Sequence, residues 1–219
     1  MDDAVIQLLV LAGIALFLVI RLKNVLGTRT GFEKPPAVDA AGRADVRRDF
    51  EVIEGGPDRD ITDHVDDGTP AAKALAAMKL AEPGFSVTEF VGGARQAYEM
   101  ILMAFESGDL GQVQAFLSED VYEAFLSVVS EREDKGLRVE ANFVGVRETV
   151  LQEAEFDRAT DEAQITLRFV AELTSVVRDE EGTIVEGNPN EIKKQRDVWT
   201  FARRMGVDDP NWKLVATGG

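Results

Sequence analysis

The first hydrophobic run of the chain predicts a membrane-spanning helix. Residues 4–20 contain no charged side chain, and a helix of this length spans about 26 Å, at the short end of the range that crosses a bilayer. Arg21 and Lys23 can extend to the lipid headgroups, which lets the apolar run continue to Leu26. We therefore predict an anchor over residues 1–26, with the anchoring residues Ala4, Ile6, Leu9, Leu11, Ile14, Leu16, Phe17, Val19, Ile20, Arg21 and Lys23.

The charges on either side of this run predict its orientation. Asp2 and Asp3 precede it, and four basic residues follow it closely, namely Arg21, Lys23, Arg29 and Lys34. Basic flanks stay in the cytoplasm, so we expect a single-pass protein with its N-terminus outside and everything after residue 21 inside. A cleaved signal peptide is the main alternative, but it would begin with basic residues and end in small ones. A buried globular helix is disfavoured by the length without charge.

Residues 27–69 have the composition of a flexible acidic linker. They contain Pro35-Pro36, Gly55-Gly56-Pro57 and many Asp and Arg residues, with little apolar periodicity. His64, the only histidine of the chain, has no neighbouring metal-ligand pattern and is interpreted as inert. The exception to the polar composition is a short candidate docking element formed by Val46, Phe50, Val52 and Ile53.

Helical patterns begin near Pro70 and predict a folded domain over residues 70–219. An alanine-rich helix over residues 71–80 ends before Pro83-Gly84. The next helix has a capping box and a hydrophobic staple at its start, formed by Ser86 with Glu89 and by Phe85 with Phe90.

Gly108 ends the helix that begins at Ser86, and two further helices are predicted after it. Asp109 is a candidate cap for a short helix. Ser118 is a candidate cap for a longer helix, whose apolar stripe consists of Val121, Tyr122, Phe125, Val128 and Val129.

After Gly136 the hydrophobic period changes to two, which predicts strands. The stretch LRVEANFVGVRETV alternates with a slip at Phe143-Val144, so we expect a bulge there. Turn residues and strands around DVWTFAR and NWKLVAT follow. Helices first and antiparallel strands afterwards predict an α+β domain with helices packed on one face of a curved sheet. The clearest buried face consists of Ile165, Leu167, Phe169, Ala171 and Leu173.

Composition narrows the function classes. The formal net charge of −16 repels nucleic-acid phosphates, so we predict no nucleic-acid partner. The absence of cysteine excludes disulfides and thiolate chemistry. The domain has Tyr98 and Tyr122 but no histidine, and the sequence has no phosphate-binding loop, metal-ligand spacing or nucleophile motif. We therefore predict that the protein is not an enzyme and has no cofactor.

Three stretches carry a family resemblance: YEMILMAFESGDLGQVQAFLSEDVYEAF, ITLRFVAE and DVWTFARRMGVDDPNWKLVATG. In this order they resemble the Tim-forty-four-like (Tim44-like) family over roughly residues 70–218. The family includes the C-terminal domain of a mitochondrial inner-membrane translocase subunit, a mitochondrial ribosomal protein and membrane-anchored bacterial adaptors. The resemblance implies a cone-like domain similar to the nuclear-transport-factor-two fold, with an apolar pocket between helices and sheet. The chaperone-binding N-terminal region of the translocase subunit has no match here, so chaperone recruitment is not implied.

The anchor and the resemblance together predict a tethered adaptor or scaffold at the cytoplasmic face of a bacterial inner membrane. Its partners would be membrane lipids, through the N-terminal helix, and one or more proteins, in protein transport or envelope biogenesis. A carrier or sensor of a lipid or small apolar ligand is the first alternative, and a ribosome-to-membrane anchor is the second. Trp199 and Trp212 are candidate stacking groups, although strand tryptophans more often lie in a core. The candidate partner or pocket surface consists of Leu75, Met78, Leu80, Phe143, Phe169 and Trp199.

Overall fold

The computed structural model describes residues 57–218. The predicted anchor and residues 27–56 of the predicted linker lie outside these residues. Within residues 57–218 no helix is both long and apolar enough to cross a membrane. The elements are α2 (Arg59–Thr62), α3 (Pro70–Ala81), α4 (Val87–Ser107), the 3₁₀ turns η1 (Leu110–Gln112) and η2 (Gln114–Phe116), α5 (Glu119–Asp134), β1 (Arg138–Asp157), β2 (Glu162–Arg178), β3 (Ile184–Gly187), β4 (Lys193–Arg204) and β5 (Lys213–Gly218).

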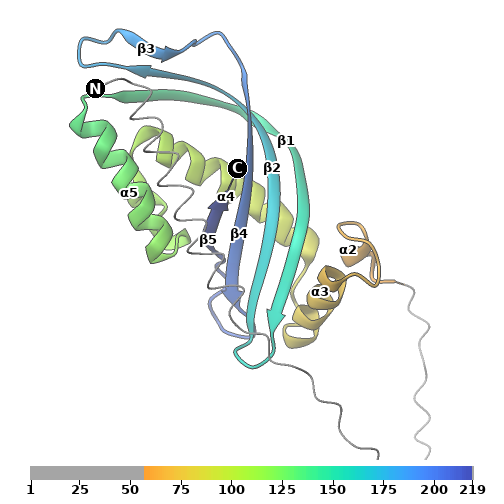
Figure 1. Ribbon diagram of the computed structural model, residues 1–219. Coiled ribbons are helices and arrows are strands. Elements are labelled where there is room, and N and C mark those ends of the chain that lie inside the picture. The colour runs from red at the N-terminus through yellow and green to blue at the C-terminus, as the bar shows by residue number, and fades with distance from the viewer. Residues whose placement is uncertain (1–56, 219) are drawn as a thin grey trace, which may run out of the picture. The chain divides into compact units, whose positions relative to one another are not determined.

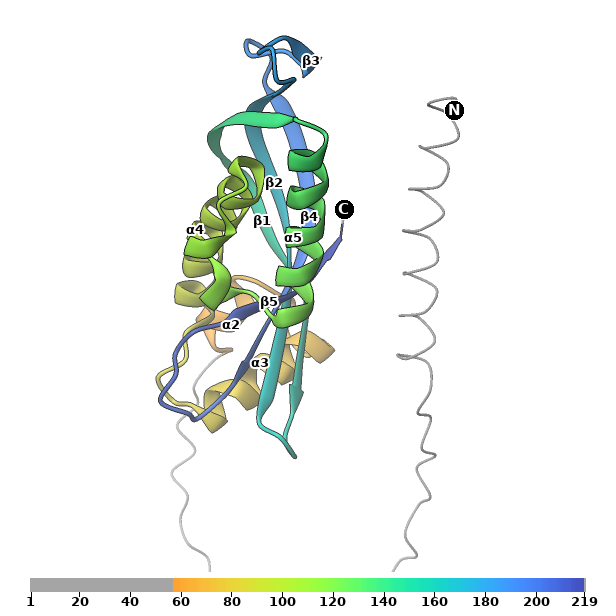
Figure 2. The ribbon, with the colours of Figure 1, turned by 90° about the vertical axis from the view of Figure 1, so that its left-hand side faces the viewer.

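The strands form one antiparallel sheet, and this confirms the predicted α+β class. The order in the sheet is β1-β2-β4-β5, and the short β3 pairs with the outer end of β2. The sheet is strongly curved, and α4 and α5 lie on the same side of it (Figures 1 and 2). The predicted bulge is confirmed, because the β1–β2 register shifts between Phe143 and Gly145. Two more shifts along β1 add to its bend.

The two serine caps and the aromatic staple predicted from the sequence form in the structure, whereas the predicted Asp109 cap does not. The Ser86 hydroxyl accepts a hydrogen bond from the Glu89 N–H at 3.2 Å, and the Phe85 and Phe90 rings lie 6.4 Å apart. Gly108 ends α4 with φ 82°, a left-handed conformation that favours glycine. Ser118 caps α5 through the Val121 N–H at 3.3 Å. The short helix predicted after residue 109 is instead the two 3₁₀ turns, and the side chain of Asp109 caps neither of them.

The folded part begins before the expected boundary at Pro70. Helix α2 lies in the stretch predicted to be linker, and its Ile61 is buried in the core. Asp60 accepts hydrogen bonds from the N–H groups of Val87 and Thr88 at 2.8 and 2.9 Å, so it caps the first turn of α4 from outside the helix. Lys79 of α3 also binds Asp60, at 2.9 Å. Asp60 therefore joins α2, α3 and α4 into one unit.

Replacing Asp60 with alanine is expected to destabilise residues 53–219, which form one compact unit. Loss of the cap and the Lys79 contact should lower the free energy of unfolding at pH 7 by about 2 kcal/mol. Burial alone would raise the pKa of Asp60, but hydrogen bonds from Thr88, Lys79 and Val87 hold it well below its ordinary 3.8. The stabilising contribution is therefore complete above pH 3.8 and is lost as the pH falls further.

Urea unfolding at pH 7 and pH 2.5 measures this difference. The gap between the wild type and the Asp60→Ala variant should shrink at the lower pH. Asp63→Ala is the matched control, because Asp63 is an exposed acid at the other end of α2, and it should change stability by less than about 0.5 kcal/mol. A gap that is the same at both pH values would contradict the prediction.

Candidate functional site

The six residues predicted as a partner or pocket surface do not form one surface. Leu75, Met78, Phe169 and Trp199 are buried in the core. Phe143 packs against this core with partial exposure. Leu80, by contrast, is 81% exposed at the end of α3. The apolar patterns of the sequence selected positions that are mostly buried. Of the six predicted residues, Leu80 is the one whose side chain is largely exposed and can contact a large partner.

An aromatic cluster around Tyr98 fills the space between α4 and the sheet. The Tyr98 ring stacks on Phe169 at 4.4 Å and contacts Trp199 at 4.6 Å between centroids. Its hydroxyl donates to Asp197 of β4 at 2.5 Å. Burial, followed by the Asp197 interaction, raises the pKa of Tyr98, which keeps the hydroxyl protonated. The core reading of Trp199 is therefore the correct one, and the cluster holds the sheet to α4.

A second aromatic group surrounds a groove that is open to solvent. We call it the Trp212 groove, and its volume is about 350 Å³. Its lining includes small residues of α4, aromatic rings and charged side chains. We name these three groups the floor (Gly93, Ala94 and Ala97), the walls (Phe85, Phe90, Phe116, Phe201 and Trp212) and the rim (Glu82, Glu89 and Arg203).

Trp212 is positioned by a turn and by its neighbours. The Asn211 N–H donates to the Asp209 carboxylate at 3.0 Å, which confirms the turn predicted at Asp209-Pro210-Asn211. The indole lies 4.5 Å from the Phe90 ring, between centroids. The Arg203 guanidinium carbon lies 5.4 Å from the centre of the indole ring. Trp212 is thus held firmly while part of its surface stays exposed.

Arg203 is the most buried charge among the residues that line the groove. Its side chain is only 7% exposed and binds Glu82 at 2.7 Å. Glu82 also accepts the Gly206 N–H at 2.9 Å. Burial alone would raise the pKa of Glu82, but the Arg203 and Gly206 hydrogen bonds lower it overall. The sequence left open whether Arg203 was paired or solvated, and the structure shows that it is paired.

Comparison with known families identifies the domain. Residues 71–219 match the Tim44-like domain. The chain belongs to the Tim44-like domain family. The prediction of family membership is therefore confirmed, and the match begins at the start of α3.

Two curated relatives share the Tim44-like domain at low identity. The chain is 22% identical to mitochondrial import inner membrane translocase subunit TIM44-1 of Arabidopsis thaliana over 152 residues, 67% of this chain and 32% of the relative. It is 23% identical to the human subunit TIM44 over 167 residues, 72% of this chain and 36% of the relative. The chain thus spans about a third of the length of these relatives. Among solved structures, it is similar to the intermembrane space region of chloroplast protein ARC6, with 11% identity, a TM-score of 0.38, and coverage of 60% of this chain and 92% of that one.

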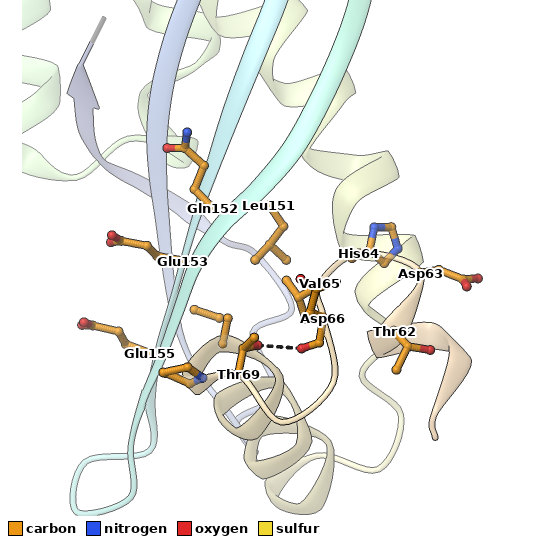
Figure 3. A pocket seen from close by; sticks show the side chains of 13 residues that line it. Thr62, Asp63, His64, Val65, Asp66, Thr69, Leu151, Gln152, Glu153 and Glu155 are labelled. Carbon is orange, nitrogen blue, oxygen red and sulfur yellow. Dashed lines mark hydrogen bonds between the residues drawn. The ribbon is translucent and has the colours of Figure 1, made fainter. Parts of the chain in front are cut away.

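A larger cavity of about 750 Å³ lies between the α2–α3 loop and β1. In Figure 3 its acidic side chains diverge, since Glu153 and Glu155 point away from the loop that carries Asp66. His64, predicted to be inert, bonds to Thr88 of α4 at 3.1 Å. Within residues 57–218 no group of three or more metal-ligating side chains is close enough to hold an ion. The cavity is therefore a polar gap that lacks convergent chemistry.

The sequence reasoning missed the groove because its floor is defined by small residues. A pair of glycines, Gly92 and Gly93, lies in the interior of α4, where glycine is unfavourable. That pair was the signal available in the sequence.

Proposed function

We propose that this Tim44-like protein is a membrane-tethered adaptor that binds a helix of a protein partner in the Trp212 groove. Its place would be the cytoplasmic face of a bacterial inner membrane, held by residues 1–26. The uncharged run over residues 4–20 and the basic residues after it support the anchor. Both curated relatives are named as inner-membrane translocase subunits, which supports work at a membrane. The cone-like fold with an apolar pocket belongs to this proposal, and the groove is the pocket that we assign to it.

The bare floor of the groove is the observation that carries the proposal. Glycine in a helix interior is about 0.5–1 kcal/mol less favourable than alanine. A Cβ atom at Gly93 would meet no other atom within 4 Å, so no contact inside the described domain requires a glycine there. A partner that lies against α4 gives a reason for the missing side chain.

The shape and charge of the groove favour a helical partner. Gly93 and Ala97 are four residues apart, so they lie on the same face of α4 and allow close approach of a second helix. The aromatic walls suit one large apolar side chain of that helix. Glu89 is exposed at the rim, and the chain as a whole is strongly acidic. A lysine or arginine next to the apolar side chain would therefore strengthen binding.

Tethering supplies the rest of the adaptor activity. Residues 27–56 have the composition of a flexible chain, with an r.m.s. reach of about 30 Å. Such a tether raises the effective concentration of a bound partner near the bilayer. A groove of about 350 Å³ is also within the range of pockets for small molecules, so an apolar ligand is the second candidate.

Crosslinking in native membranes with a photoreactive amino acid in place of Ala97 tests the proposal. Gly93→Leu should reduce protein crosslinks roughly tenfold, because the leucine fills the floor of the groove. Gly92→Leu is the matched control, since Gly92 does not line the groove and also has free space around it. Both substitutions should raise the melting temperature by about 2–4 °C, because leucine favours helix more than glycine does.

Mass spectrometry of the crosslinked products decides among the functions. Envelope or transport proteins that are lost only in Gly93→Leu would support the adaptor. Ribosomal proteins would instead indicate a ribosome anchor, and a stoichiometric lipid without protein would indicate a carrier. Equal crosslinking in Gly92→Leu and Gly93→Leu would exclude the groove as the docking site.

A further inference from the structure

The first five residues of β4, Lys193–Asp197, have a neighbouring strand on one side only. Residues 193–204 of β4 pair with β2, but only residues 198–202 pair with β5. Figure 2 shows the C-terminal end of β5 beside β4, with the outer part of β4 continuing past it. Within the described residues no strand covers that edge of Lys193–Asp197. We call this segment the open β4 edge.

The open β4 edge concentrates positive charge in an acidic protein. Lys193, Lys194 and Arg196 are all exposed, whereas the chain as a whole has a net charge of −16. None of the three forms an ion pair in the described structure. On this side alternate backbone N–H and C=O groups also point away from β2, and no strand within residues 57–218 pairs with them.

The hydrogen bond of Asp197 fixes which face each basic side chain occupies. The Asp197 carboxylate binds Tyr98, so it points to the side of the sheet that carries α4. Side chains alternate along a strand, so Lys194 and Arg196 point to the opposite side, away from α4. The two charges are therefore next to each other on one face, two residues apart.

We propose that the open β4 edge binds an acidic, extended segment of a protein partner, which adds a strand to the sheet. Its backbone would bond to the free N–H and C=O groups of residues 193–197. Two carboxylates at positions i and i+2 of the segment would lie opposite Lys194 and Arg196, within the reach of cross-strand pairs. The bound segment would continue the line of β5 past the end of that strand.

The neighbouring charges favour a strand over an anionic lipid surface. Glu172 is directly opposite Lys194 in β2, and it is bound by Arg147 at 2.6 Å. Glu148 lies on the same side and is bound by Arg168. A flat anionic membrane would meet these two carboxylates together with Lys194 and Arg196. Lipid headgroups also cannot form the regular hydrogen-bond ladder that a peptide strand forms with the backbone of β4. Lysine and arginine on an edge also oppose self-association, and the same charges attract an acidic strand.

The edge and the Trp212 groove are separate sites. Gly93 of the groove lies near the start of α4. Asp197, at the inner end of the edge, binds Tyr98, which is about 8 Å along α4 from Gly93. None of the residues Lys193–Asp197 lines the groove. The inference therefore stands without the groove or the anchor, and two sites would let one adaptor hold two proteins.

A binding assay on the full-length chain tests the inference with a designed peptide. The probe is a blocked, fluorescently labelled peptide of the pattern Thr-Val-Glu-Val-Glu-Val-Thr. Fluorescence anisotropy measures its affinity, and hydrogen exchange measures protection of the amides of residues 193–197. We expect binding with increased protection at those amides, and roughly tenfold weaker affinity for Lys194→Glu/Arg196→Glu. Lysine in place of both peptide glutamates should abolish binding.

Two controls separate strand addition from simple charge attraction. Lys73→Glu/Arg158→Glu makes the same change in net charge at exposed positions outside the edge and should leave the affinity within about twofold. Methylation of alternate backbone nitrogens in the peptide should weaken binding roughly tenfold, because it removes the ladder bonds. Gly93→Leu should have no effect, so failure here is distinguishable from failure of the groove.

Three results would overturn the inference. The first is absence of binding by the acidic peptide. The second is equal affinity of the methylated and unmethylated peptides, which would mean charge attraction without strand addition. The third is preferential binding of vesicles containing phosphatidylglycerol, with peptide binding displaced by them, which would assign the edge to lipid.

Discussion

Replacing Arg203 with alanine is expected to lower the free energy of unfolding by about 3 kcal/mol. Arg203 is buried, and it binds Glu82 at 2.7 Å across 121 positions of sequence. Its removal leaves the Glu82 carboxylate without its main partner and takes packing from beside Trp212. The expected loss is at the lower end for a buried pair, because the side chain of Glu82 is 27% exposed. Urea unfolding of residues 53–219 measures it.

Companion variants separate charge from packing in this prediction. Arg203→Met keeps most of the volume, so any loss that persists comes from the unpaired Glu82. Arg203→Met with Glu82→Gln should recover part of the loss, as a double-mutant cycle detects for residues in contact. Because the pKa of Glu82 is lowered in the folded state, the pair stabilises above the ordinary value of 4.5 and less as the pH falls below it. A loss under about 1 kcal/mol for Arg203→Ala would contradict the assignment of a buried ion pair.

Local signals in the sequence predicted the starts of α4 and α5 and the end of α4 at Gly108. The Ser86 and Ser118 caps involve partners three residues away, and the Phe85–Phe90 staple joins neighbours in sequence. Such interactions depend on spacing alone, so the residue order contains them. The bulge after Phe143 and the buried face of β2 followed in the same way from a period of two.

Features that join distant parts of the chain could not be read in this way. Asp60 caps α4 from 27 and 28 positions away, and it lies in a stretch whose polar composition indicated a linker. Composition reports how much apolar area a segment can bury, but it says nothing of a single carboxylate that completes another helix. The fold therefore begins earlier than the apolar pattern suggested.

The candidate surface shows a related limit of periodicity. A pattern identifies the apolar face of an element, but it cannot say whether another element covers that face. Leu75 and Met78 are covered, whereas Leu80, two positions further, is exposed. The apolar pattern did not predict the Trp212 groove, because Gly93 has no side chain and there is free space around it. A pattern of apolar residues identifies positions where side chains are present, and it does not identify positions where one is missing.

From the proposed anchor we expect that removing residues 1–26 releases the protein from the membrane into the soluble fraction. The remaining chain would lose the uncharged run over residues 4–20 and would keep an acidic body, which anionic lipid repels. Among the helices of residues 57–218, none is long and apolar enough to cross a membrane. Fractionation with alkaline carbonate extraction should move nearly all of the protein from pellet to supernatant.

Deletion of residues 27–52 is the matched control for this change. It removes a stretch of the same length but keeps the apolar run and the basic residues Arg21 and Lys23, so the protein should stay in the pellet. Replacing both Ile14 and Ala15 with lysine should release the protein from the pellet, as removal of residues 1–26 does. Insertion of a charged side chain at the centre of a membrane span costs about 3 kcal/mol of free energy. If the protein lacking residues 1–26 stayed in the carbonate-resistant fraction, the domain itself would be membrane-integrated. This result would contradict the proposal that residues 1–26 tether the domain and thereby concentrate its partners at the bilayer.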